Sequence, residues 1–277
     1  MVAGVLGSYS TTVLNVGARW GDAGAWWRID PVASSVGFDP DPQECERLNA
    51  LSSSPRTERY IPLALGAEKR EAVLYETKEP ACSSVYPPDE ALKKRFPQLG
   101  VIETVKRHSV ELTPLDEWWL SEERPHVSFL KIDTQGSELD ILKGAQSLLT
   151  DCLGCEVEVE FSPIYQGQPL FSDVDSFLRE RGFVLWRLND LCHYSETPEV
   201  PGERGRLYWA NAVYLRDYRT LGTSDEEWRK TMILAVLLEA LGDKAAARSC
   251  VKQALQGLGD ASVEKPTPEL ELSGNPA

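Results

Sequence analysis

The residues best placed for chemistry lie in FLKIDTQGSELDILKG, residues 129–144, where an apolar run ends at Asp133 and a small polar turn follows. An amphipathic pattern begins directly after the turn, so the segment predicts a strand, a turn and a helix. Ser137 and Asp140 form a capping-box pattern at the start of this helix, and its predicted buried face contains Leu139, Leu142, Ala145 and Leu149. In open α/β sheets, ligands bind beyond the carboxyl ends of the strands. Asp133 therefore stands where a carboxylate could take a proton from a substrate, and it is the first candidate for a general base.

A glycine loop forms a second strand-to-turn junction, in VLNVGARWG (13–21). Gly17 and Gly21 do not fit the dinucleotide fingerprint G-x-G-x-x-G, because Trp20 stands where that motif needs its third glycine. Asp39 ends the next apolar run and could accept hydrogen bonds from ribose hydroxyls. Such a loop followed by an acid suits S-adenosylmethionine, which has a ribose and no pyrophosphate, better than NAD. A tight structural turn would explain the same glycines equally well.

Two further residues could serve as the base. Glu160 lies next to the end of the run 156–161, where strand alternation places it on the same face as Glu156 and Glu158. His193 is expected in a loop, and histidine is the residue type that most readily exchanges protons near neutral pH. The alternatives are that Asp133 only caps its turn, that Glu160 ends a solvated polar stripe, and that His193 is a surface residue.

A metal ion is not expected. Asp133 could join Gln135, Glu138 or Glu160 in an oxygen-rich site, but no observation requires one. The single C-x-x-C pair, Cys152 and Cys155, falls short of the four ligands of a structural zinc site.

Apolar runs alternate with helical patterns along most of the chain, which favours a parallel sheet flanked by helices. Strands are predicted at 13–18, 32–39, 60–65, 129–133 and 156–161, and helices from Pro42, from Ser137 and over 174–181. Region 67–123 is less regular, with β segments at 72–77 and 105–113, a polar loop at 82–92 and a short helix at 115–120. The last strands, 183–188 and 209–215, are joined by a Gly/Pro turn without a helix, so they predict an antiparallel hairpin.

The composition changes after Arg219. Two amphipathic patterns, 225–241 and 244–255, predict a helical hairpin that caps the domain or pairs two copies as a homodimer. We therefore divide the chain into a catalytic domain (1–219), the hairpin (220–258) and an acidic, Pro-containing tail (259–277) that is expected to be disordered.

The bulk properties exclude several classes of protein. The net charge of −14 argues against a nucleic-acid binder, which needs a basic face. No apolar run approaches the ~20 residues that span a bilayer, so no membrane segment is expected. The start of the chain lacks the basic region and cleavage site of a signal peptide. Six scattered cysteines are unlike a disulfide scaffold and point to a reducing cytoplasm.

The chain resembles the FkbM family of S-adenosylmethionine-dependent methyltransferases. The resemblance is carried by NVGARWG (15–21), GFDPDPQECERL (37–48), ALG (64–66), FLKIDTQGSELDILKGA (129–145) and EVEFSPIYQGQPLFSDVDSFLRERGF (158–183). It implies the class I methyltransferase fold, a Rossmann-like α/β seven-stranded sheet with an antiparallel last strand.

The resemblance also implies roles for individual residues. The cofactor loop would contain Gly17, Ala18 and Gly21, Asp39 would bind the ribose, and the segment around Leu65 would lie near the adenine. Between cofactor and acceptor would stand Asp133, Gln135 and Gly136. The chain departs from the family at Asn15, where the usual aspartate would add a charge-assisted hydrogen bond.

The implied reaction is transfer of a methyl group to a hydroxyl of a sugar, glycan or secondary metabolite, with a small-molecule or carbohydrate acceptor and no nucleic acid. One alternative is an NAD-dependent oxidoreductase or epimerase, which the glycine spacing and the lack of a Tyr-x-x-x-Lys pair in a matching helix disfavour. The other is a non-catalytic binding module that kept the fold.

Overall fold

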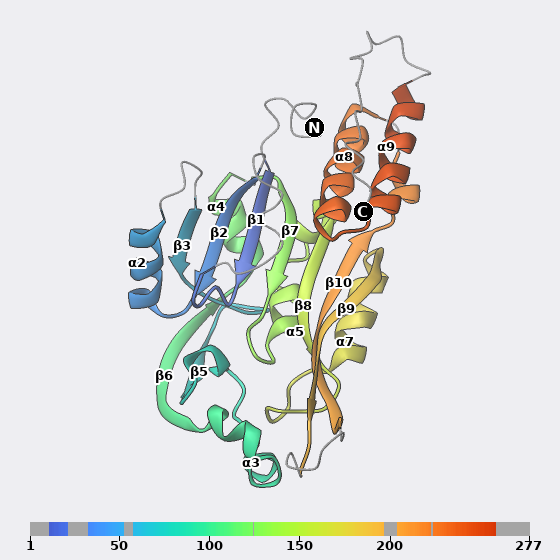
Figure 1. Cartoon of the computed structure of the whole chain (residues 1–277). Helices are drawn as coiled ribbons and strands as arrows, with labels where there is room; N and C mark the ends of the chain where they lie inside the picture. The colour runs from blue at the N-terminus through green and yellow to red at the C-terminus, as the bar shows by residue number, and fades with distance from the viewer. Residues whose placement is uncertain are drawn as a thin grey trace.

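A seven-stranded sheet forms the centre of the molecule (Figure 1). The computed structural model describes residues 11–21, 33–52, 58–123, 125–196, 204–222 and 224–258. In spatial order the strands are β3 (Glu58–Pro62), β2 (Ala33–Asp39), β1 (Thr11–Val16), β7 (Val127–Ile132), β8 (Gly154–Glu160), β10 (Arg206–Arg216) and β9 (Phe183–Tyr194). The first five pair in parallel, and β10 is antiparallel to both of its neighbours. The sheet with a reversed last strand that the resemblance implied is confirmed.

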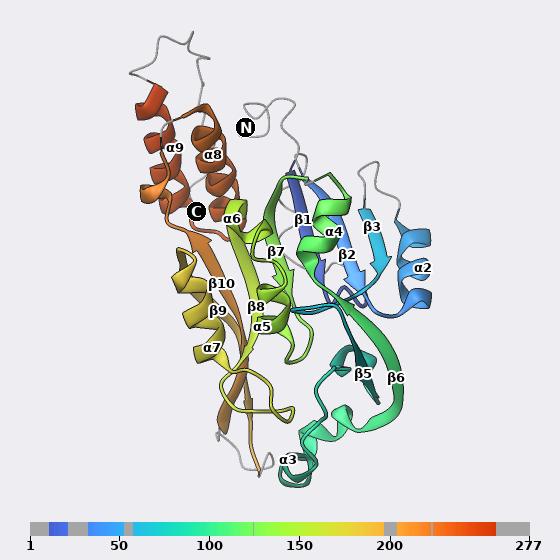
Figure 2. The same cartoon turned by 180° about the vertical axis from the view of Figure 1, so that it is seen from behind.

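One face of the sheet is covered by four helices (Figure 2). They are α4 (Leu115–Ser121), α5 (Glu138–Lys143), α6 (Leu148–Asp151) and α7 (Phe171–Glu180). Alternate strand residues supply the other half of this core because successive side chains point to opposite faces; among them are Leu14, Val16, Leu130, Ile132, Val157 and Val159. The edge strand β3 packs against α2 (Pro42–Leu51), which Asp41 caps by accepting hydrogen bonds from the backbone N–H of Gln43 and Glu44.

The opposite face of the sheet contacts the C-terminal hairpin of α8 (Asp225–Ala240) and α9 (Lys244–Leu258). A second hydrophobic cluster joins Val13, Phe129 and Leu215 of the sheet to Ile233 and Leu237 of α8. The hairpin therefore shares a buried cluster with the central strands. In the described part of the chain, no helix combines the length and the apolar character needed to cross a membrane.

A smaller sheet lies beyond the carboxyl ends of the central strands (Figure 1). It contains β4 (Ala64–Leu65), β6 (Thr104–Thr113) and β5 (Arg70–Thr77) in that order, and the chain between β5 and β6 includes α3 (Glu90–Arg95). Leu65 pairs with Thr113, so the beginning and the end of this inserted segment lie side by side. The backbone N–H of Gly66 also donates to the carbonyl of Thr113, at a distance of 3.1 Å.

Two predicted elements have different bounds in the structure. The strand predicted at 60–65 is split, because β3 ends at Pro62, which has no N–H to donate, and Ala64 and Leu65 join the smaller sheet. The helix predicted from Ser137 is interrupted after Lys143, and Leu149 belongs to the separate α6. At that interruption a Cβ on Gly144 would stand 2.1 Å from the carbonyl oxygen of Gly66, so the close approach of the two segments requires glycine.

The predicted capping box at Ser137 is wrong, because its side chain caps no backbone N–H and its Oγ donates to Thr134 Oγ1 instead. The hairpin of β9 and β10 is confirmed and longer than predicted, so His193 lies in β9 and not in a loop. The segment 25–29, in the connection after the first predicted strand, and the tail 259–277 lie outside the described residues.

Candidate functional site

The glycine loop follows β1 and turns sharply at Gly17, whose φ of 80° lies in the left-handed region. The backbone N–H groups of Gly17 and Ala18 both donate to the carbonyl of Phe38, at 2.9 Å each. A Cβ on Gly17 would overlap the carbonyl oxygen of Asp133 at 1.8 Å. Gly21 closes the loop with a second positive φ, 83°. The side chain of Ala18 is fully buried against Leu48 and α2, so Ala18 contributes to the loop through its backbone alone.

Asp39 lies at the end of β2 and is 4% exposed. Its Oδ1 accepts hydrogen bonds from the backbone N–H of Asp41 at 2.8 Å and from Nη2 of Arg19 at 3.4 Å. The same Arg19 nitrogen lies 2.7 Å from Oδ2 of Asp41. Burial raises the pKa of Asp39, while the N–H of Asp41 and the positive charge of Arg19 oppose that shift. Arg19 thus partly neutralises a buried acid that faces the cleft.

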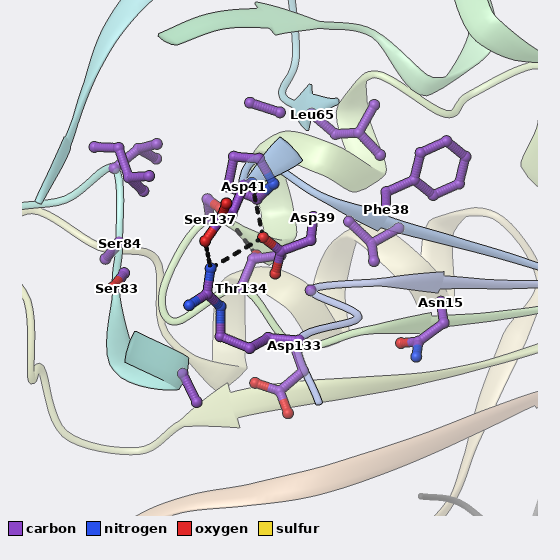
Figure 3. Close-up of a pocket in the computed structure, with 18 of the residues that line it drawn as sticks. Asn15, Phe38, Asp39, Asp41, Leu65, Ser83, Ser84, Asp133, Thr134 and Ser137 are labelled. Atoms are coloured by element: carbon purple, nitrogen blue, oxygen red, sulfur yellow. Dashed lines mark hydrogen bonds and ion pairs between the residues drawn. The ribbon is translucent and has the colours of Figure 1, made fainter. Parts of the chain in front are cut away.

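Asp133 follows the last residue of β7, and its backbone N–H donates to the carbonyl of Val16 at 3.0 Å. Its side chain is about one-third exposed, at 34%, with Nζ of Lys131 3.5 Å away and Nε2 of Gln135 donating to its Oδ1 at 3.1 Å. Figure 3 shows Asp133 and Asp39 at the ends of β7 and β2, the two strands that flank β1, with Ser83 and Ser84 across the space from them. The carboxylate of Asp133 is therefore held by a cation and an amide while it remains open to the cleft.

Gln135 stabilises the turn after Asp133 on the side that faces away from the cavity. Its φ of 61° is unusual for a residue with a side chain. Its amide nitrogen also donates to Glu158, its amide oxygen accepts from the hydroxyl of Tyr165 at 3.1 Å, and its carbonyl accepts from Oγ of Ser84 at 2.7 Å. Gln135 and Gly136 do not line the cavity. They fix the backbone that presents Asp133.

Three buried glutamates lie behind the same turn. Glu138 accepts hydrogen bonds from the backbone N–H of Thr134 at 2.7 Å and of Gly136 at 2.9 Å. Burial raises the pKa of Glu138 to about 7, against the opposing effect of these N–H donors. Burial, together with neighbouring carboxylates, also raises the pKa of Glu158 and of Glu160 well above the ordinary range.

These acids do not form a site open to the cleft. Glu160 is 3% exposed and lies outside the cavity lining. Across the described ranges, no group of three or more His, Cys, Asp or Glu side chains is arranged to hold a metal ion.

The cleft itself is a cavity of about 1150 Å³ at the carboxyl ends of the central strands. Six of the residues singled out in the sequence line it: Asn15, Gly17, Gly21, Asp39, Leu65 and Asp133. Ala18, Gln135, Gly136, Glu160 and His193 do not. His193 is exposed on β9 and pairs with Leu207 of β10. The structure therefore separates the three candidate bases and leaves Asp133 alone of them in the cavity.

Other residues that line the cavity were not predicted from the sequence. The smaller sheet contributes Leu74, Glu76, Lys106 and His108, and the segment after β5 contributes Ser83 and Ser84. The signal that could have found them is the alternation in 105–113, which places Lys106, His108 and Val110 on one face of a strand.

The family model described as the Methyltransferase FkbM domain matches residues 15–185 of the 277-residue chain. The match begins at Asn15 and includes the glycine loop, Asp39, the smaller sheet and the Asp133 turn. A search of curated proteins gives no match.

Similar solved structures include the magnesium protoporphyrin IX methyltransferase of Synechocystis PCC 6803 with bound S-adenosylmethionine, at 9% identity and a TM-score of 0.38, covering 78% of this chain and 74% of that chain. A TehB-like methyltransferase from Corynebacterium glutamicum is 12% identical with a TM-score of 0.32, covering 78% and 85% of the two chains. A methyltransferase from Methanosarcina mazei is 7% identical, also with a TM-score of 0.32, covering 78% and 96%.

Proposed function

We propose that this chain, which belongs to the FkbM methyltransferase family, methylates a hydroxyl group of a small molecule or carbohydrate. The family assignment makes the protein an S-adenosylmethionine-dependent methyltransferase. The acceptor atom, the residue roles and the acceptor class belong to the proposal. The observation that carries it is the convergence of Gly17, Asp39 and Asp133 on one cavity at the carboxyl ends of β1, β2 and β7.

The cavity offers groups that suit the parts of the cofactor. Asp39 is an acid at a strand end, as ribose hydroxyls require, and Leu65 and Phe38 provide apolar surface for the adenine. Gly17 lets the loop turn directly against the carbonyl oxygen of Asp133, where no Cβ would fit, and so keeps the loop backbone at the cavity. Asn15 would meet the methionine end, where an amide oxygen can accept a hydrogen bond from the amine. When bound, the cofactor supplies a methyl group on a sulfonium that is ready to leave.

Asp133 is the residue that we assign to the acceptor hydroxyl. Its carboxylate reaches the cavity, so it can accept the hydrogen bond of the hydroxyl, orient its oxygen and take its proton as the new bond forms. Lys131 and Gln135 hold this carboxylate in one orientation. Glu160 and His193 lie away from the cavity, which favours Asp133 among the three candidates.

Three further parts of the proposal concern the whole chain. The described residues that line the cavity all lie within 1–219, which supports assigning the catalytic unit to that range. We propose that the hairpin stabilises this unit and pairs two copies, and that 259–277 is an accessory tail. The six cysteines form no disulfide, in keeping with a reducing compartment such as the cytoplasm.

The experiment that tests the cofactor site is calorimetric titration of the full chain with S-adenosylmethionine, S-adenosylhomocysteine and NAD. We expect micromolar binding of both adenosyl ligands and none of NAD. In Asp39→Asn, which keeps the shape of the side chain, affinity should fall about 10- to 100-fold, because hydrogen bonds to a charged acceptor are lost. Asp225→Ala, a change at an exposed acid in α8, is the control and should bind as the wild type does.

Two outcomes would contradict the proposal. Binding of NAD without the adenosyl ligands would support an oxidoreductase or epimerase. Failure of the folded chain to bind any of the three would leave a binding module that has kept the fold without the cofactor site.

A further inference from the structure

The face of the smaller sheet that is turned toward the cavity forms one of its walls. Leu74 and Glu76 of β5 and Lys106 and His108 of β6 all line the cavity. Leu74 is opposite His108 and Glu76 is opposite Lys106, with the Tyr75–Arg107 pair between them, so the four side chains share one face of an antiparallel pair. This wall combines an apolar patch with hydrogen-bonding groups, which is the usual composition of a small-molecule site.

Glu76 and His108 form a hydrogen-bonded pair on this wall. Nε2 of His108 lies 2.6 Å from Oε2 of Glu76, and the two side chains are 36% and 38% exposed. An ionised carboxylate can only accept a hydrogen bond, so Nε2 must be the nitrogen that carries the hydrogen. In a neutral imidazole, Nδ1 is then an acceptor. Glu76 therefore selects the tautomer in which His108 can receive a hydrogen bond from a hydroxyl.

This wall is fixed relative to Asp133 by a short series of contacts. Tyr75, next to Leu74, pairs with Ser84, and its backbone N–H donates to the carbonyl of Ser84 at 2.8 Å. Oγ of Ser84 donates to the carbonyl of Gln135, two residues after Asp133. Figure 3 shows Ser84 across the space from Asp133. The wall and the Asp133 turn are thus joined as opposite sides of one cavity.

The cavity is large enough to hold an acceptor between the wall and the Asp133 turn in addition to a cofactor. Its volume of about 1150 Å³ exceeds the upper end, roughly 1,000 Å³, of typical single-ligand sites. A cofactor held by Asp39 and Gly17 would occupy one part, and an acceptor the part between Asp133 and the wall.

We propose that His108, held by Glu76, binds a second hydroxyl of the acceptor while Asp133 holds the hydroxyl that is methylated. The acceptor class is then a compound with at least two hydroxyls several ångströms apart, and a mono-alcohol lacks the group that this wall recognises. This inference rests on the proposed function. His108 acts here as a specificity residue, and Glu76 as the positioning residue that fixes its tautomer.

The first test needs no turnover. In 15N-histidine-labelled protein saturated with S-adenosylhomocysteine, long-range 1H–15N spectra report which ring nitrogen carries the hydrogen. We expect the Nε2–H tautomer for His108, a mixture of tautomers in Glu76→Gln, and a shift of the Nδ1 resonance on titration with methyl α-D-glucopyranoside. His193→Asn and His126→Asn assign the remaining signals. An Nδ1–H tautomer, or no shift with the glycoside while the cofactor product is bound, would overturn the inference.

The second test separates recognition from chemistry. With tritiated S-adenosylmethionine, we expect His108→Asn to raise KM for methyl α-D-glucopyranoside about 5- to 100-fold through the lost hydrogen bond, with kcat within about twofold. Cyclohexanol, with one hydroxyl, should be methylated equally by the wild type and the variant. His193→Asn, a change at an exposed histidine outside the cavity, should match the wild type for both alcohols.

The outcomes distinguish the two proposals. An unchanged KM for the glycoside in His108→Asn, or an equal loss for cyclohexanol, would overturn the second-hydroxyl subsite while leaving the methyltransferase intact. Absence of transfer to either alcohol by a wild type that binds S-adenosylhomocysteine would count against hydroxyl methylation as proposed. The glycoside titration of His108 would still decide whether the subsite exists.

Discussion

The carbonyl oxygen of Asp133 lies against Gly17, only 1.8 Å from where a Cβ on Gly17 would stand. The backbone N–H of Asp133 in turn donates to the carbonyl of Val16. The loop assigned to the cofactor and the turn assigned to the acceptor are therefore in direct backbone contact. A change that displaces one of them must displace the other.

Gly17→Ala should abolish cofactor binding. The new methyl group would overlap backbone and not a flexible side chain, and the left-handed φ adds about 1–2 kcal/mol of strain. Gly167→Ala is a matched control, because Gly167 has a similar φ of 78° and nothing within 4 Å of its added Cβ. We expect both variants to lose some thermal stability and only Gly17→Ala to lose affinity for S-adenosylhomocysteine in calorimetry. Equal affinities would contradict the close contact.

Asp133→Asn should reduce kcat with little effect on cofactor affinity. The amide can still accept the hydrogen bond from Gln135, whereas it can no longer take a proton, so we expect a loss of roughly 10²- to 10⁴-fold. The measurement is transfer of tritiated methyl to methyl α-D-glucopyranoside, beside calorimetry with S-adenosylhomocysteine. A variant with the wild-type kcat would show that Asp133 only stabilises its turn.

Glu138→Gln should flatten the dependence of stability on pH. Burial raises the pKa of folded Glu138 from 4.5 to about 7, so the folded state holds this proton more tightly than the unfolded chain. The resulting stabilisation is complete below about pH 4.5 and is lost as the pH rises through 7, at up to about 1.4 kcal/mol per pH unit for one proton.

Urea unfolding between pH 5 and pH 8 measures this effect. The free energy of unfolding of the wild type should fall with pH, and the fall should be smaller in Glu138→Gln. Glu158 and Glu160, whose pKa values are raised mainly by burial, still contribute in the variant, although the charge of Glu138 no longer adds to their shifts. Glu180→Gln, a change at an exposed glutamate of α7, should keep the wild-type slope. An unchanged slope in Glu138→Gln would exclude this carboxyl as a source of the pH dependence.

Removal of residues 224–277 should destabilise the catalytic unit. The deletion uncovers Val13, Phe129 and Leu215 on the face of the sheet, and exposed clusters of this kind promote aggregation. Removal of 259–277 alone is the control, and it should leave the thermal midpoint unchanged. Light scattering on the full chain and on the two shortened chains also tests the proposed dimer. The proposal requires the full chain to have twice the mass of one copy.

The part of the site that we propose for the cofactor could be predicted from the sequence, because its residues follow local patterns. Gly17, Asp39 and Asp133 each stand at the end of an apolar run, and the parallel pairing of β1, β2 and β7 brings such ends to one edge of the sheet. The buried residues of the helix after Asp133 were also predictable from their spacing, since Leu139, Leu142 and Ala145 are all buried. The interruption at Gly144 was not, because it depends on contact with Gly66, far away in the sequence.

The part that we propose for the acceptor could not be predicted in the same way. The pair of Glu76 and His108 exists only because β5 and β6 pair in one register across the intervening chain, and no local pattern encodes that register. Glu160 illustrates the converse error. It stands at a strand end, as Asp133 does, yet its side chain is buried behind the turn and not in the cavity. The position of a residue along a strand predicts at which edge of the sheet it lies. It does not predict whether its side chain faces the cavity or the buried interior.

The pairing of Leu65 with Thr113 brings the two ends of the smaller sheet's segment together at one point. The wall that we propose for the acceptor is thus built from one uninterrupted stretch of chain, which begins and ends at the same place. Gly17, Asp39 and Asp133 lie outside it, at the ends of β1, β2 and β7. Evolution or an engineer could exchange that stretch as a cassette. The expected result is a new preference for acceptors on an unaltered methyl-donor site.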